Sequence, residues 1–321
     1  MEIENLLSKS FNWRFEREKS IDKDFEAIRL FAGQSDGIEG MLIEQYGELI
    51  LTSLYNSKLS KYTERFLEFL NSYFPNKTIL IKARDENTKG KFIYSNNEKY
   101  NIDAILNCVE NGLKYEIHTD PRHDYGLYLD TKAARNYLRD NCKNKNVLNL
   151  FSYTCAFGIV EMKGAAKSVT NIDPNKEYLE WGQHSADLNQ IQFKKYPDTA
   201  QAYLARHSRR LESGKDSPYD IIVVDPPAFL VGRGPNRLAR NLWPTWMKGL
   251  KDSGCHEFII IINDKSLGRQ NDLSDFFKKG LGENIEIIPI KQSFDVIGQE
   301  INNSDDPFYF NPAIFSITKY D

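Results

Sequence analysis

Short apolar runs bounded by turn residues alternate with amphipathic stretches along most of the chain. The first third is expected to hold two strands joined by a turn at Gly47 within residues 41–51, a helix at 58–73, and strands at 78–83, 92–94 and 104–109. Asn111-Gly112 is a typical hairpin turn between the last of these strands and the next apolar segment. This pattern predicts a small α+β unit.

From about residue 119 the pattern becomes a regular alternation of strand and helix. The expected strands are residues 146–151, 168–173, 199–204, 220–225, 257–262, 284–290 and 312–318. The clearest helical patterns are residues 131–140, 175–189 and 270–280. Strands that alternate with helices indicate a parallel sheet. We therefore expect an α/β fold with two domains, an N-terminal α+β domain at residues 1–118 and a larger domain at residues 119–321.

Composition places the chain among soluble globular proteins. Its 321 residues suggest about two domains, and 40% hydrophobic with 27% charged residues excludes a disordered chain. The first residues lack the basic start and apolar run of a signal peptide. No apolar run approaches the roughly 18 residues of a membrane span. We expect a cytoplasmic protein that does not enter a membrane.

The cysteines and the net charge narrow the expected sites. None of the four cysteines, Cys108, Cys142, Cys155 and Cys255, forms a Cys-x-x-Cys pair, so neither a metal site nor a disulfide scaffold is expected. The formal net charge is −3. A surface that binds nucleic acid would therefore have to be local, because the charge of the whole protein does not attract RNA.

Small and polar residues follow the first strand of the alternating region, at Ser152-Tyr153-Thr154-Cys155. In an open α/β sheet, ligands bind outside the carboxyl ends of the strands. The start of the following helix offers unpaired N–H groups, and the absence of Gly-x-Gly-x-x-Gly disfavours NAD. The second strand ends at Asp173, whose carboxylate suits a ribose diol. The alternative, a helix N-cap ahead of Pro174, is compatible with that role.

A rigid acidic turn follows the fourth strand, at Asp225-Pro226-Pro227-Ala228-Phe229. Two prolines fix backbone dihedrals and remove two N–H donors, so the carboxylate and nearby carbonyls are held in place. Such a turn suits the polar atoms of a planar base, and Phe229 can stack on it for roughly 1–3 kcal/mol. The alternative interpretation is a strand terminator with a core phenylalanine.

Basic residues lie near both segments. Arg233 and Arg237 belong to a loop rich in glycine and proline, which fits contacts with phosphate. Arg122 is expected to line the mouth of the site. The alternative for each is an ordinary solvated side chain.

On these motifs the chain resembles the S-adenosylmethionine-dependent methyltransferases of large-subunit ribosomal RNA, over roughly residues 28–321. Residues 30–46, which include Asp36-Gly37-Ile38-Glu39-Gly40-Met41-Leu42-Ile43, resemble the linker domain of that family. Tyr125-Gly126-Leu127-Tyr128-Leu129-Asp130 resembles its Gly-x-Phe-Leu-Asp motif. Asn149-Leu150-Phe151-Ser152-Tyr153-Thr154 resembles its cofactor motif, with Cys155 in place of the usual glycine. The acidic residue that normally contacts adenine near the third strand is missing, and Arg206 and His207 occupy that region.

The resemblance implies a Rossmann-like class I methyltransferase sheet with S-adenosylmethionine as cofactor and ribosomal RNA as partner; it leaves a homodimer open. The cofactor-binding residues implied are Tyr128, Asn149, Phe151, Ser152, Tyr153, Thr154, Asp173 and Asp225. The implied catalytic residues are Asp225, Pro226, Pro227, Phe229 and Asn263. Arg122, Arg233 and Arg237 are expected to bind substrate.

The segment after the fifth strand bears on the target base. Asn263-Asp264-Lys265 resembles the 7-methylguanine branch of the family. Methylation of cytosine carbon 5 needs a cysteine nucleophile, and relatives that methylate it carry that cysteine at this place. We therefore expect transfer to guanine nitrogen 7 without a covalent intermediate. Methylation of an exocyclic amine, a small-molecule or protein acceptor, and an inactive binding module are the alternatives.

Overall fold

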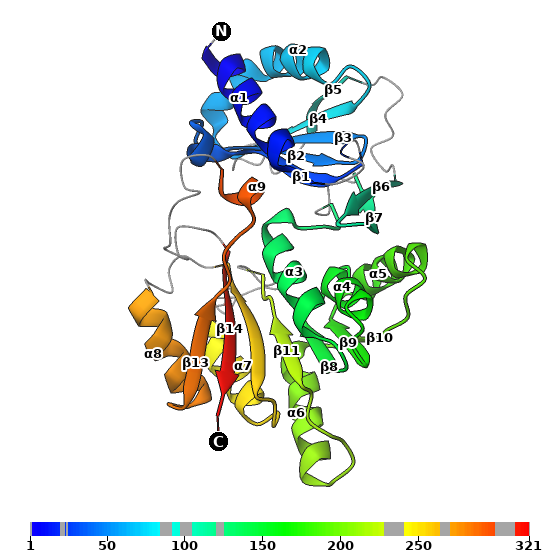
Figure 1. Cartoon of the computed structure of the whole chain (residues 1–321), viewed down its shortest axis with the longest axis vertical. Coiled ribbons are helices and arrows are strands. Elements are labelled where there is room, and N and C mark those ends of the chain that lie inside the picture. The colour runs from blue at the N-terminus through cyan, green and yellow to red at the C-terminus, as the bar shows by residue number, and fades with distance from the viewer. Residues whose placement is uncertain are drawn as a thin grey trace. The chain divides into compact units, whose positions relative to one another are not determined.

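The structure is a computed structural model. It describes residues 2–19, 23, 25–83, 92–96, 105–119, 125–227, 241–263, 270–298 and 312–320. The chain forms two compact units, Met1–Leu129 with Ser293–Ser304 and Asp130–Gln292 with Asp305–Asp321 (Figure 1). The predicted fold class, an α/β sheet with a smaller α+β unit, is confirmed. The return of residues 293–298 to the first unit was not indicated by any sequence pattern.

The first unit is built on a five-stranded sheet in the order β1-β2-β3-β4-β5. Its strands are β1 (Ala27–Ala32), β2 (Met41–Tyr46), β3 (Leu49–Leu54), β4 (Thr78–Ala83) and β5 (Phe92–Ser95). Only β3 and β4 pair in parallel. The predicted turn at Gly47 joins β2 to β3, and β6 (Ile105–Glu110) forms a separate hairpin with β7 (Leu113–His118). Asn111 and Gly112 both have positive φ, as the predicted hairpin turn requires.

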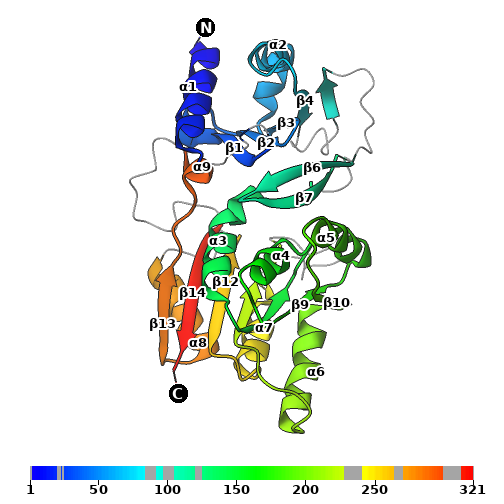
Figure 2. The same ribbon diagram turned by 45° about the vertical axis from the view of Figure 1, so that its right-hand side comes forward.

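Two helices, α1 (Glu2–Arg17) and α2 (Thr63–Tyr73), cover one face of this sheet (Figures 1 and 2). Helix α1 was not predicted, yet Ile3, Leu7, Phe11 and Phe15 recur every fourth residue and pack into the core of this unit. The short helix α9 (Phe294–Ile297) lies at the edge strand β1, where Asp295 Oδ2 accepts from the Arg29 N–H at 3.2 Å. This contact satisfies a donor that the sheet leaves unpaired.

The second unit contains a seven-stranded sheet in the order β10-β9-β8-β11-β12-β14-β13. Its strands are β8 (Asn146–Leu150), β9 (Ser168–Asp173), β10 (Lys194–Pro197), β11 (Ile221–Val224), β12 (Glu257–Ile262), β13 (Ile285–Pro289) and β14 (Ala313–Lys319). Its helices are α3 (Lys132–Asn141), α4 (Ala156–Lys163), α5 (Lys176–Leu188), α6 (Ala200–Glu212), α7 (Trp243–Lys251) and α8 (Gln270–Leu281). The sheet is mixed rather than wholly parallel, because β14 runs antiparallel to both neighbours.

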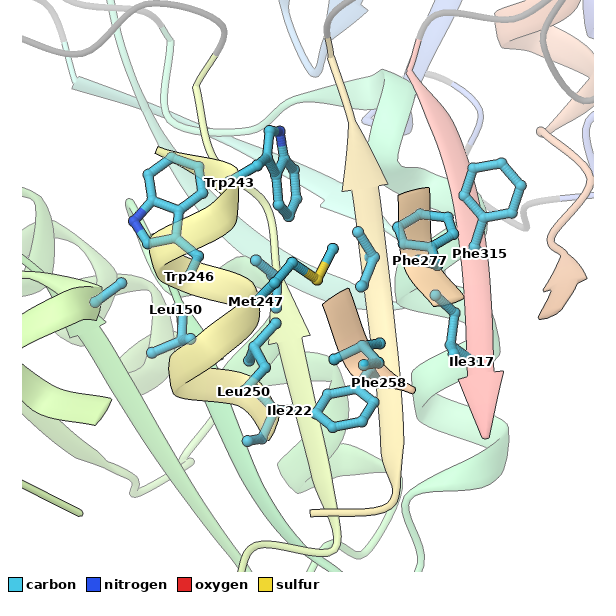
Figure 3. Close-up of a cluster of buried hydrophobic side chains, with 14 of the residues drawn as sticks. Leu150, Ile222, Trp243, Trp246, Met247, Leu250, Phe258, Phe277, Phe315 and Ile317 are labelled. Carbon is cyan, nitrogen blue, oxygen red and sulfur yellow. The ribbon is translucent and has the colours of Figure 1, made fainter. Parts of the chain in front are cut away.

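Side chains that alternate along the strands build a core on each face of this sheet. Figure 3 shows one of them, in which Trp243, Trp246 and Met247 of α7 pack over Leu150, Ile222 and Phe258. On the opposite face, α3 and α4 cover Val147, Val169 and Val223. The alternation explains why Leu148 and Leu150 belong to the first core while Asn149 points the other way.

The third strand lies elsewhere than predicted. Residues 199–204 were expected to be a strand, but Ala200 begins helix α6, and Thr199 caps it by accepting from the Ala202 N–H at 3.2 Å. The strand is β10, an edge strand whose residues Lys194-Lys195-Tyr196-Pro197 are mostly exposed. A strand of this kind has no apolar run, which is why the pattern did not reveal it.

No helix in the described part of the chain is both long and apolar enough to cross a bilayer.

Candidate functional site

The carboxyl ends of four parallel strands bring the predicted site segments to one edge of the second sheet. Leu150, the last residue of β8, lies opposite Ile172 of β9 and Val224 of β11, and Val224 lies opposite Ile260 of β12. The segments that follow these strands are therefore neighbours in space. Ligands bind at this edge in open α/β sheets, so it is the candidate site.

The turn after β8 has an unusual backbone. Phe151, Tyr153 and Cys155 have φ values of 60°, 46° and 58°, which are left-handed conformations that residues other than glycine seldom adopt. Backbone of this kind is retained where the surrounding structure enforces it, often at ligand sites. The Phe151 ring contacts Trp246 with 4.9 Å between centroids, while Ser152 and Thr154 are buried. Cys155 occupies the position that a glycine would adopt without strain.

Asp173 ends β9 and is tied to this turn. Its Oδ2 accepts from the Tyr153 N–H at 3.0 Å, and its Oδ1 accepts from the Asn175 N–H at 2.9 Å. The N-cap of α5 is Asn175 rather than Asp173, because Asn175 accepts from the Glu177 N–H. Burial raises the pKa of Asp173, and the two backbone hydrogen bonds oppose that shift. Each carboxylate oxygen retains a lone pair with which it can accept from a ribose hydroxyl.

The structure reveals an acidic residue that the sequence interpretation missed. Asp198 follows β10 directly, and its N–H donates to the Asp173 carbonyl at 3.1 Å. Its carboxylate accepts from Arg206 of α6 and from the Thr199 N–H. The acidic residue expected after the third strand is thus present. It was overlooked because that strand was placed several residues too late.

Asn149 is the penultimate residue of β8, but its side chain is turned into the core. Its side chain is 0% exposed and donates to Glu161 Oε2 at 2.7 Å and to Asn171 Oδ1 at 3.0 Å. The side chain points into the core under α4. The Asn149 side chain is therefore not exposed for the expected contact with the cofactor. Asn149 would instead affect cofactor binding through the position of β8.

Asp225 and Asn263, which follow β11 and β12, form a hydrogen-bonded pair. Asn263 Nδ2 donates to Asp225 Oδ1 at 3.0 Å and to the Pro226 carbonyl at 3.1 Å. Burial and the negative charge of Asp130 raise the pKa of Asp225 to about 7, although Asn263 and Arg135 oppose the shift. Pro226 is buried and Pro227 is exposed. The pair therefore presents a half-buried carboxylate that can accept from an N–H donor or exchange a proton near neutral pH.

Four of the other predicted residues are not described by the structure, and one belongs to the first unit. Arg122, Phe229, Arg233 and Arg237 lie outside the described residues. Tyr128 is 44% exposed and belongs to the first unit. All four cysteines of the chain are buried. Within the described ranges, no group of three or more His, Cys, Asp or Glu side chains is arranged to hold a metal ion.

Comparisons with known proteins show which family the chain belongs to. A family model described as S-adenosylmethionine-dependent methyltransferase matches residues 96–273. The ribosomal RNA large subunit methyltransferase I of Aliivibrio fischeri is 27% identical over 245 residues, which are 68% of this chain and 60% of that protein. The chain thus spans about 60% of the length of the curated relatives that it matches.

Two solved structures share the fold. SMU.776, in a complex with SAH, matches with a TM-score of 0.80 and 22% identity over 98% of this chain and 81% of that one. The SAM-dependent methyltransferase from Agrobacterium tumefaciens matches with a TM-score of 0.62 and 16% identity over 92% and 90% of the two chains. At these identities the likeness extends to the fold alone.

Proposed function

Because the chain belongs to the family of S-adenosylmethionine-dependent methyltransferases, we propose that it transfers a methyl group from this cofactor to a base of ribosomal RNA. The observation that carries the proposal is the meeting of two carboxylate sites at one sheet edge. Asp173, tied to the turn after β8, suits a nucleoside, and the Asp225–Asn263 pair suits a polar planar acceptor.

The residues at this edge fit the methyl donor. Asp173 would accept from the ribose hydroxyls, and Asp198 would accept from the amino group of adenine. Asp130 lies close enough to Asp225 to raise its pKa, so this end of the sheet carries negative charge that suits a positively charged sulfonium. S-adenosylmethionine supplies an electrophilic methyl group when it is bound. The protein then has to align the donor and acceptor and exclude water.

The printed names of the curated relatives support RNA as the acceptor class, since these proteins are ribosomal RNA methyltransferases. The rigid Asp-Pro-Pro turn adds to this, because a fixed carboxylate and carbonyl recognise the edge of a base. A small-molecule or protein acceptor is the second candidate. The net charge of −3 favours it, because the protein as a whole does not attract a polyanion.

For the acceptor atom, we propose direct transfer without a covalent enzyme–RNA intermediate. Attack on cytosine carbon 5 would need an accessible thiolate. Burial raises the pKa of Cys142 to about 11 and those of Cys155 and Cys255 to about 12, and Cys108 is also buried. The names of the relatives include ribosomal RNA but no base, so the narrower expectation of guanine nitrogen 7 gains no support from them.

The experiment combines binding with product analysis. Calorimetry should show that the protein binds S-adenosylmethionine. Ribosomal RNA from cells that lack the protein should then accept methyl label, and mass spectrometry of its nucleosides should identify the base. Asp225→Ala should keep cofactor binding but lose most turnover, whereas Asp252→Asn, an exposed change at the C-cap of α7, should change neither. Label that enters only protein or small molecules would refute RNA as substrate.

A further inference from the structure

A polar cluster lies inside the second unit, behind the strand ends that carry the candidate site. It consists of Asn149 of β8, Glu161 of α4 and Asn171 of β9, each 0% exposed. The single nitrogen Asn149 Nδ2 donates to Glu161 Oε2 at 2.7 Å and to Asn171 Oδ1 at 3.0 Å. These two hydrogen bonds link strand β8 to helix α4 and to strand β9.

Stability does not explain this cluster. Val147, Val169 and Ile259 on the same face of the sheet are apolar. Asn149 Oδ1, Glu161 Oε1 and Asn171 Nδ2 are buried without a hydrogen-bond partner among the described residues. Polar atoms buried in this way destabilise a fold compared with an apolar core. Local departures from the most stable arrangement are expected where function demands them.

The position of the cluster indicates which function it serves. Asn149 comes one residue before the end of β8, where the left-handed turn begins. Asn171 precedes Asp173 by two residues on β9, and Glu161 lies on α4, which begins directly after Cys155. A side-chain Cβ at Gly158 would lie 2.6 Å from Asn171 Nδ2, so glycine allows α4 to approach β9 this closely. Each of the three residues is therefore close along the backbone to the turn at residues 151–155 or to Asp173.

We propose that Glu161 is a positioning residue for the methyl donor: through Asn149 it holds α4 against β8 and β9, so that the turn at residues 151–155 and Asp173 keep the arrangement that binds the cofactor. This inference rests on the proposed function. Glu161 does not touch the donor and acts only through its neighbours.

The protonation state of Glu161 is consistent with such a role. Burial raises the pKa of Glu161 to about 8, and the hydrogen bond from Asn149 only partly opposes this. The titratable groups that interact with Glu161 are the thiols of Cys142, which follows α3, and of Cys155 in the turn. Their raised pKa values keep both thiols neutral at pH 7. A neutral Glu161 places no buried charge near the site proposed for the methyl donor. It can accept a hydrogen bond from Asn149 without needing a positively charged partner.

The test compares three variants of the full chain for binding of S-adenosylhomocysteine by calorimetry, with thermal unfolding measured in parallel. Glu161→Gln keeps a neutral side chain that can accept from Asn149, and it should bind within about twofold of wild type. Glu161→Leu removes the link, and it should bind about fivefold more weakly, as the loss of one hydrogen bond predicts. Its unfolding midpoint should be no lower than that of wild type. Lys163→Gln, an exposed change on the same helix, should alter neither property.

A folded Glu161→Leu variant that binds as tightly as wild type would overturn the inference and leave the proposed function intact. A wild-type protein that binds no S-adenosylhomocysteine would overturn both. If Glu161→Leu does not fold, Glu161→Met takes its place, because it removes the same hydrogen bond with a more flexible apolar side chain. Binding as tight as that of wild type by a folded Glu161→Met protein would overturn the inference.

Discussion

The side-chain amide of Asn263 donates to the carboxylate of Asp225 at 3.0 Å, across the ends of two parallel strands. The same nitrogen donates to the Pro226 carbonyl at 3.1 Å. The hydrogen bond from Asn263 fixes the orientation of the Asp225 carboxylate and favours its ionised form. Burial and the negative charge of Asp130 favour the neutral form. Together these effects give a pKa of about 7. Substitution of a residue that contacts Asp225 should therefore shift the pH dependence of the reaction rate.

The rate of methyl transfer should rise as the pH passes about 7, because only ionised Asp225 can accept from a base N–H with both oxygens. Asn263→Ala should move the midpoint to higher pH, since a hydrogen bond to the charged form is lost. Initial rates at saturating cofactor between about pH 5.5 and 9 measure this. Asp225→Asn is the control, because its low residual rate should not titrate. An unshifted midpoint in Asn263→Ala would show that the pair does not govern the rate.

Asp173→Ala should weaken binding of S-adenosylmethionine by roughly ten- to a hundredfold, because a hydrogen bond to a charged group contributes about 1.5–3 kcal/mol. Calorimetry measures the affinity. Asn175→Ala removes the neighbouring helix cap but leaves the Asp173 carboxylate in place, and it should have a much smaller effect on affinity. Wild-type affinity in a folded Asp173→Ala protein would rule out the ribose role.

Asp198→Ala should weaken binding of S-adenosylhomocysteine by about two- to tenfold, as expected for one hydrogen bond to adenine. Arg206→Ala is the matched control, because it removes the ion-pair partner and leaves the carboxylate. An exposed ion pair contributes little, so this variant should fold normally and bind at least as well as wild type. If the two variants lose the same affinity, the ion pair rather than an adenine contact would be responsible.

RNA that contains 5-fluorocytosine should not become covalently attached to the protein. A covalent adduct needs a thiolate, but all four cysteines are buried, and burial raises the pKa of Cys142, Cys155 and Cys255. Denaturing gels with labelled RNA would reveal an adduct. Cys108→Ser, Cys142→Ser and Cys255→Ser, each checked for folding, should retain methyl transfer. A stable adduct that one of these changes abolishes would establish the covalent mechanism instead.

The wild-type unfolding temperature should fall relative to that of Glu161→Gln as the pH rises from about 5 to 8. In the folded state Glu161 keeps its proton up to about pH 8, whereas in the unfolded chain it ionises near its ordinary value of 4.5. The unfolded state therefore binds fewer protons across this window, so the contribution of Glu161 to stability is complete below it and is lost as the pH rises through it. Scanning calorimetry at several pH values measures the difference. Parallel curves for the two proteins would mean that Glu161 is ionised in the folded state.

The amino-acid sequence by itself determined most elements of the second unit. The buried strands β11 and β12 contain continuous apolar runs, and β8 and β9 are short buried segments that mix apolar and polar residues. The pattern of the chain located all four strands and their carboxyl ends. The edge strand β10 lacked such a run, and an apolar stretch at the start of α6 was taken for it. Asp198 was missed for the same reason, since its role depends on where the strand ends.

Only the tertiary structure decided which polar groups meet. The periodicity of hydrophobic residues indicates which residues of one segment are buried. The order of strands in a sheet and the partners of a side chain depend instead on contacts between residues far apart in the sequence. Asn149 belonged to a recognisable cofactor motif, yet packing turned its side chain inward to Glu161 and Asn171. Nothing in the run of residues around Glu161 distinguished it from an exposed charge on a helix. Its burial follows from the face that α4 presents to the sheet, which long-range packing alone determines.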